Sequence, residues 1–262
     1  MLNEWPLILF TTLGQTGAGL ALFAGLQSLT ATDDEALAVK PGLQFLLAAL
    51  LMGAGFGFAA MHLGSPGRMF NSMAQLGSSA LSQEGLAGML TAILCGVAGV
   101  SGLKGRVNKA LAGTSAVACL VFVYTMARIY ASMTTVPTWS TPLTPVSFFG
   151  AALFAGGALF GATAKADIPG LPMATLGMIL GGLMLLVSIP LQAQSALELV
   201  NEPAVLNCLG ACSAVLLGLA LAGGMLGNAR PRVRIPAFLL GLGGVLLART
   251  LFYGLHTTLI MH

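Results

Sequence analysis

Charged residues are scarce in this chain. Its 262 residues include only 11 Lys and Arg and 8 Asp and Glu, which is 7% of the total, against roughly 25% in soluble domains. A soluble fold with so few charges has too little polar surface to face water, which excludes soluble enzymes and nucleic-acid-binding proteins. Apolar residues make up 56% of the chain, which excludes a disordered protein. The composition therefore predicts an integral membrane protein.

Long apolar stretches recur along the chain, and a bilayer crossing needs about 20 such residues. They predict an all-α fold, a single membrane domain over residues 1–262 that forms a bundle of eight transmembrane helices. The expected spans are 6–29, 43–63, 85–102, 110–131, 146–164, 172–191, 204–226 and 236–256. No Lys or Arg precedes the first apolar run, and no small-x-small cleavage site follows it. The first span is therefore expected to be a retained helix rather than a cleaved signal peptide.

Basic residues gather on one side of this eight-span arrangement. Arg68 falls in a loop on the other side, while Arg128 and Arg249 fall inside spans. The remaining eight lie in loops on the first side: Lys40, Lys104, Arg106, Lys109, Lys165, Arg230, Arg232 and Arg234. Because Lys and Arg collect in cytoplasmic loops, both termini are predicted to be outside.

Several features recur about 120 residues apart. The pair Arg128 and Tyr130 near the end of the fourth span is echoed by Arg249 and Tyr253 in the eighth. A parallel repeat of two four-helix units explains this, since an even number of spans preserves orientation. Coincidence in an apolar sequence of low complexity explains it too. Gly53 with Gly57 and Gly177 with Gly181 have the small-xxx-small spacing that favours close helix packing.

The richest polar cluster joins the second and third spans. His62 ends the second span, Glu84 opens the third, and Ser65 and Arg68 lie between them. An imidazole exchanges protons near neutral pH, so an imidazole and a carboxylate at the outer face suit a substrate that loses protons with electrons. A quinol is such a substrate, and Arg68 would orient its oxygens or hold Glu84 ionised. In the alternative interpretation, His62 is an interfacial anchor and Glu84 an ordinary first-turn acid favoured by the helix dipole.

Other polar residues lie within the spans. Gln15 is in the outer half of the first span, where it would bind a ring oxygen or make a helix-to-helix hydrogen bond. Arg128 and Tyr130, at the outer end of the fourth span, are candidate walls of a quinol site, although snorkelling to the interface explains Arg128 equally well. Arg249 is deeper and is expected to face protein or a water-filled cavity.

The run His62-Leu63-Gly64-Ser65-Pro66-Gly67-Arg68, with Ser82-Gln83-Glu84 after it, resembles the signature of the dimethyl sulfoxide (DMSO) reductase membrane-anchor family. Its members are the integral membrane subunits of three-part molybdoenzymes of anaerobic respiration. The resemblance implies a subunit of the bacterial cytoplasmic (inner) membrane that oxidises menaquinol at the outer face and does not itself perform the terminal reduction. It also implies that His62 and Glu84 act in quinol binding, with Ser65 and Arg68 in the same motif.

The resemblance further implies what the partners carry. Electrons pass to an iron–sulfur subunit with [4Fe-4S] clusters on the outer face. They continue to a catalytic subunit that holds a molybdenum bis-guanine-dinucleotide cofactor. This chain itself is expected to bind no cofactor: its four cysteines lie within spans, and none has the spacing of a metal site.

Two other functions remain open on the sequence. In a small secondary transporter, Arg128, Arg249 and Glu84 would bind a solute near the midplane, where transporter sites usually lie, whereas the polar cluster here is at one surface. In a haem b cytochrome subunit, His62 and His256 would be the axial ligands.

Overall fold

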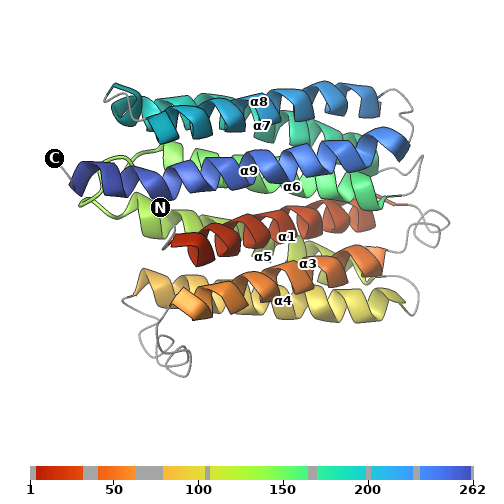
Figure 1. The fold of residues 1–262 in the computed structure, drawn as a ribbon. Coiled ribbons are helices and arrows are strands. Elements are labelled where there is room, and N and C mark those ends of the chain that lie inside the picture. The colour runs from red at the N-terminus through yellow and green to blue at the C-terminus, as the bar shows by residue number, and fades with distance from the viewer. Residues whose placement is uncertain are drawn as a thin grey trace.

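The computed structural model describes residues 4–31, 41–62, 79–103, 107–164, 170–198, 202–226 and 231–260. Within this part the chain is all helix apart from short connections (Figure 1). The helices are α1 (Trp5–Thr30), α3 (Pro41–His62), α4 (Ala80–Leu103), α5 (Lys109–Ala131), α6 (Leu143–Thr163), α7 (Gly170–Glu198), α8 (Glu202–Leu226) and α9 (Pro231–Ile260). These 8 helices are each long and apolar enough to cross a membrane, which confirms the predicted fold class.

Some helices extend beyond the expected spans. α4 begins at Ala80 rather than Gly85, so Glu84 lies inside the helix instead of in front of it. The Ser79 hydroxyl accepts from the Ser82 amide (3.4 Å), and such a serine caps a helix start. α7 and α9 likewise continue past the apolar runs, with Pro190 and Pro236 inside them. The apolar run marks the membrane crossing, whereas the helix includes the polar turns on either side of it.

The eight helices form two rings of four. α1, α3, α4 and α5 contact one another in sequence, and α1 closes the first ring against α5; α6, α7, α8 and α9 do the same in the second. The rings meet mainly where α1 packs on α6 (Figure 1). α9 also contacts α1, and α5 contacts α6. In each of these two contacts, the last helix of one ring packs on the first helix of the other. We call these rings the first and second units.

Glycines allow α1 and α6 to touch. A Cβ atom on Gly19 would lie 1.9 Å from the Ala152 carbonyl oxygen, and one on Gly156 would lie 2.4 Å from the Gly19 Cα. Only residues without side chains permit this approach. The contact fixes the position of the two units relative to each other.

One of the two predicted glycine pairs has this role and the other does not. A Cβ on Gly181 would lie 2.6 Å from the Gly150 carbonyl oxygen, so Gly177 and Gly181 lie at tight helix contacts as expected. The prediction for Gly53 and Gly57 is wrong within the described part of the chain, because no atom of that part lies within 4 Å of either Cβ position. Spacing identifies a smooth helix face but not the direction in which that face points.

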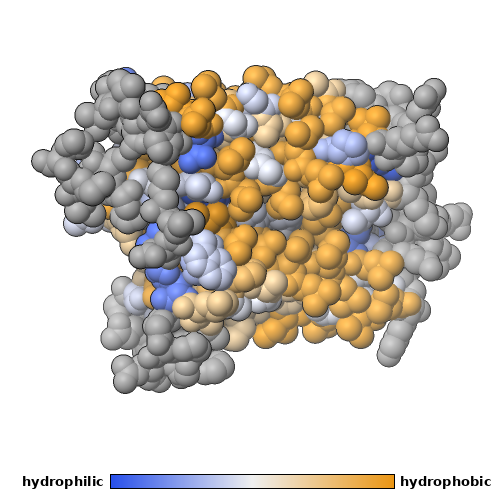
Figure 2. All heavy atoms as spheres, viewed as in Figure 1, coloured by the Kyte–Doolittle hydropathy of each residue, from blue (hydrophilic) through white to orange (hydrophobic). Residues whose placement is uncertain are grey.

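The exterior of the bundle is apolar where lipid would contact it. Figure 2 shows a broad apolar belt across the middle of the bundle with hydrophilic residues toward its two ends. Large side chains such as Leu50, Leu206 and Leu239 are exposed, while Arg249 and Gln15 are fully buried inside the bundle. This distribution is the one that a bilayer requires.

Candidate functional site

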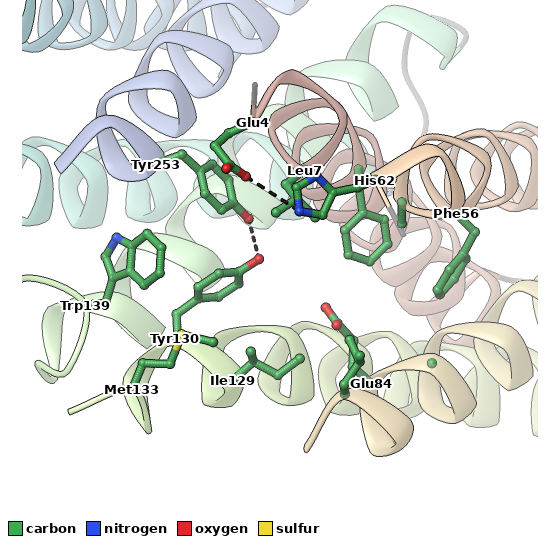
Figure 3. A pocket seen from close by; sticks show the side chains of 14 residues that line it. Glu4, Leu7, Phe56, His62, Glu84, Ile129, Tyr130, Met133, Trp139 and Tyr253 are labelled. Carbon is green, nitrogen blue, oxygen red and sulfur yellow. Dashed lines mark hydrogen bonds and ion pairs between the residues drawn. The ribbon is translucent and has the colours of Figure 1, made fainter. Parts of the chain in front are cut away.

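A cavity of about 480 Å³ lies at the end of the bundle where α1 begins and α9 ends. We call it the end cavity (Figure 3). Its size falls in the range of small-molecule sites. Its lining combines apolar side chains with a few polar ones: Glu4, Leu7, Phe10, Phe56, Ala59, His62, Leu81, Glu84, Gly85, Ile129, Tyr130, Met133, Trp139 and Tyr253.

Glu84 is the buried carboxyl group of this cavity. It lies in the second turn of α4 and is 4% exposed. Its Oε1 atom has no hydrogen-bond partner among the residues that the structure describes. Leaving a buried polar atom unpaired costs free energy, and such an atom in a native protein points to a ligand or water that the site is built to hold.

His62 lies at the rim of the same cavity. It is the last residue of α3, its side chain is 39% exposed, and its Nε2 atom lies 3.8 Å from Oε2 of Glu4. His62 and Glu84 therefore line one cavity from the end of α3 and the start of α4, and the carboxylate that pairs with His62 is Glu4. Ser65 and Arg68, the other two motif residues, lie outside the described residues.

Two tyrosines form a second polar point on the cavity wall. Tyr130 on α5 and Tyr253 on α9 both line the cavity, and the Tyr253 hydroxyl donates to the Tyr130 hydroxyl (2.6 Å). Trp139, in the connection between α5 and α6, packs edge-on against Tyr130 (ring centroids 5.3 Å apart). Tyr130 was a predicted wall residue, whereas sequence reasoning missed Glu4, Trp139 and Tyr253 as site residues. The signal for Tyr253 was the repeat, which pairs it with Tyr130.

The remaining predicted residues lie outside the cavity lining. Gln15 is buried between helices, where its Oε1 accepts from Arg249 Nε (3.2 Å) and its Nε2 donates to the Met126 sulfur (3.5 Å). It makes the helix-to-helix hydrogen bond of the alternative interpretation. Arg128 is exposed and donates to the Gln83 side chain. Of the predicted candidates, the structure thus brings His62, Glu84 and Tyr130 together.

Arg249 is buried behind the cavity wall. It is 1% exposed, and its Nη2 donates to the Ser147 carbonyl (2.9 Å). Its guanidinium lies over the Phe148 ring, 4.0 Å from the centroid, and Phe148 packs on Tyr130 at 5.6 Å. Arg249 thus faces protein, one of the two environments expected for it, and places a positive charge behind the tyrosines.

Within the described part of the chain, no three His, Cys, Asp or Glu side chains are placed to hold a metal ion together. Cys95, Cys119, Cys208 and Cys212 are free thiols. The side chain of His256, considered above as a haem ligand, lies outside the described residues.

Comparison with known proteins identifies the family. The model of the DMSO reductase anchor subunit (DmsC) family matches residues 1–255. The anaerobic dimethyl sulfoxide reductase protein YnfH of Escherichia coli K12 is 34% identical, with 99% of this chain and 97% of that protein aligned. The C subunit of anaerobic dimethyl sulfoxide reductase from the same organism is 35% identical over the same shares. Its counterpart in Haemophilus influenzae is 34% identical over 56% of this chain and 54% of that protein. The family predicted from the His62–Glu84 motif is confirmed: this chain belongs to the DMSO reductase anchor subunit family and is a multi-pass protein of the inner membrane.

Proposed function

We propose that this chain is the membrane anchor of a DMSO reductase-type complex and that its end cavity oxidises menaquinol. The observation that carries the proposal is the buried Glu84 carboxyl, whose Oε1 lacks a partner among the described residues, in a largely apolar cavity of about 480 Å³. A quinol head group has an apolar ring that fits such walls and hydroxyls that need acceptors. A hydroxyl that donates to Oε1 would satisfy both groups.

The chemistry needs two proton acceptors and one electron acceptor. Oxidation converts a quinol to a quinone and releases two protons and two electrons. Glu84, at 4% exposure, takes a proton from the bound hydroxyl, while His62 and Glu4, 39% and 25% exposed, pass protons to water. This gradient of exposure leads from the buried carboxyl to the surface. The electrons leave to a partner subunit, as membership of the anchor-subunit family supports.

We place the partner subunits at the cavity end of the bundle. Family membership supports an iron–sulfur subunit with [4Fe-4S] clusters and a catalytic subunit with the molybdenum bis-guanine-dinucleotide cofactor. Lys109 begins α5 and Arg234 lies in the first turn of α9, at the opposite end, and basic residues favour the cytoplasmic side. The cavity end is therefore the periplasmic one in this proposal. Protons released there and consumed there by the reductase make the reaction electroneutral.

The transporter alternative has less support. Arg249 is the deep cation that a midplane solute would contact, but it is already bound to Gln15 and to the Ser147 carbonyl. The space beside it is only about 10 Å³, which is no more than one water requires. The haem alternative requires His62 as an axial ligand, whereas this imidazole lies half-exposed at the rim beside Glu4.

The test is Glu84→Gln in membranes that contain the whole complex. The amide keeps the shape of the side chain but cannot accept the quinol proton. We expect quinol-driven DMSO reduction to fall at least about 100-fold, as for loss of a general base, with full activity from a reduced viologen that feeds the partner subunits directly. Gln83→Ala, which changes the neighbouring side chain outside the cavity lining, is the control. Unchanged quinol activity in Glu84→Gln would refute the proposal.

A further inference from the structure

The tyrosine pair of the end cavity joins the two units. Tyr130 comes from α5 of the first unit and Tyr253 from α9 of the second, and their hydroxyl oxygens are 2.6 Å apart. The two residues are only 7% and 2% exposed. Both nevertheless line the end cavity, and Figure 3 shows their hydroxyls meeting among the side chains that line it.

The surrounding rings hold the Tyr130 hydroxyl in place. Tyr130 packs against Trp139, Phe252 and Phe148, with ring centroids 5.3, 5.4 and 5.6 Å away. The Trp139 ring is itself held by a hydrogen bond, because its Nε1 donates to the Phe252 carbonyl (2.8 Å). Packing of this kind fixes a binding group before the ligand arrives.

The hydrogen bond within the pair leaves one donor for a ligand. Tyr253 donates to Tyr130, and a phenol that accepts one hydrogen bond keeps its own proton to donate. Figure 3 shows the Tyr130 hydroxyl and the Glu84 carboxyl group projecting into the same space from α5 and α4. One group offers a proton to an oxygen, and the other accepts a proton from one.

We propose that the Tyr130–Tyr253 pair binds the second ring oxygen of the quinol while Glu84 binds the first. This inference rests on the proposed function and adds to it the residues that bind the second ring oxygen. As the quinol becomes a quinone, its two electrons leave to the partner subunit, Glu84 takes the proton of the first hydroxyl, and the proton of the second passes to His62 and Glu4, which also line the cavity. The second oxygen is then a carbonyl, which accepts the Tyr130 hydrogen bond. The pair thereby holds both the reduced and the oxidised ring.

A purely structural role is the competing explanation. A hydroxyl bond between α5 and α9 would also help to hold the units together, as interhelical hydrogen bonds do in membranes. Removing it would then weaken every ligand of the cavity alike. Removing an oxygen-binding group would weaken only those ligands that possess the second oxygen, so two ligands that differ in that oxygen separate the two roles.

The experiment uses Tyr130→Phe and Tyr253→Phe in membranes with the intact complex. Tyr124→Phe is the matched control, because Tyr124 is on the same helix α5 but is 55% exposed on the outside and does not line the cavity. The probes are 2,3-dimethyl-1,4-naphthoquinol and 2,3-dimethyl-1-naphthol, which lacks one oxygen. Their Kd values are measured without DMSO, by displacement of a fluorescent hydroxyquinoline N-oxide.

In the wild type and Tyr124→Phe, the diol is expected to bind about tenfold more tightly than the naphthol, which is the worth of one good hydrogen bond. In Tyr130→Phe this preference is expected to vanish, while viologen-driven activity stays intact. Equal weakening of both probes, or an unchanged preference, would overturn the inference. If Glu84→Gln abolishes quinol oxidation in the same membranes, the proposed function survives that result. If the wild type oxidises no quinol, the proposed function is refuted, and the inference that rests on it is refuted as well.

Discussion

Replacing Gly19 with alanine is expected to force the two units apart. The new Cβ would lie 1.9 Å from the Ala152 carbonyl oxygen, whereas ordinary contacts of this kind are 3.4 Å or longer. The atoms in conflict belong to the backbones of α1 and α6, so no side-chain rotation relieves the clash. The helices must separate locally by about 1.5 Å, because that is the shortfall between these two distances.

The cost follows from overpacking, which typically destabilises by about 1–3 kcal/mol and more where backbone must move. The gain in helix propensity from glycine to alanine offsets at most about 1 kcal/mol. We expect a net loss of about 2 kcal/mol, which for a chain of this size lowers the melting temperature by roughly 6 °C. Quinol-dependent activity should fall too, because Tyr130 and Tyr253 belong to different units.

Gly53→Ala provides the matched control. It makes the same chemical change in the middle of α3, at a position where no atom of the described residues lies within 4 Å of the added Cβ. We expect its melting temperature to equal that of the wild type or to rise slightly. The measurement is thermal unfolding of the purified complex in detergent, followed by near-ultraviolet circular dichroism. Equal melting temperatures for Gly19→Ala and Gly53→Ala would refute the close α1–α6 contact.

Two further predictions concern the charged residues around the cavity. His62→Ala should lower quinol-driven turnover and weaken the binding of a quinol-analogue inhibitor. Glu4→Gln removes only the partner of His62 at 3.8 Å and should have a smaller effect of the same kind. A larger effect of Glu4→Gln than of His62→Ala on inhibitor binding would contradict this prediction. Arg249→Met should destabilise the complex by about 3 kcal/mol, because it leaves Gln15 Oε1 and the Ser147 carbonyl without this buried donor. Arg249→Lys keeps the positive charge but loses the planar guanidinium with its several N–H donors, so its melting temperature should fall between those of Arg249→Met and the wild type. Equal melting temperatures of all three proteins would show that the Arg249 hydrogen bonds do not stabilise the complex.

Hydropathy was sufficient to predict the eight crossings, since each depends on local composition alone. The motif likewise brought together His62 and Glu84, which line one cavity in the structure, because the end of α3 and the start of α4 are near in sequence; their role in quinol binding stays a prediction. Tyr253 and Trp139 were not predicted as site residues because they reach the cavity only through packing of α9 and of the α5–α6 connection on distant helices. Apolar periodicity is too weak here to show which face of a helix meets which neighbour.

The same limit explains Gly53 and Gly19. The pair Gly53 and Gly57 has the spacing of a packing motif but touches none of the described residues at its Cβ positions, while Gly19 meets Gly156 of the other unit. A bilayer does not penalise a smooth apolar face that contacts lipid, so small residues appear on both kinds of face. Only the arrangement of the helices in space distinguishes them.

The position of the cavity follows from where a membrane bundle can place polar groups. A polar side chain that faces lipid lacks hydrogen-bond partners, so such groups must lie inside a unit or between units. Gln15 of α1 and Arg249 of α9 bind each other across the junction of the units. Tyr130 and Tyr253 do the same closer to the end of the bundle. Along this junction, polar contacts therefore continue from the buried core to the cavity wall. A ligand held by Glu84 of the first unit and by the tyrosine pair would extend this series of contacts, and the site would then depend on both units being in register.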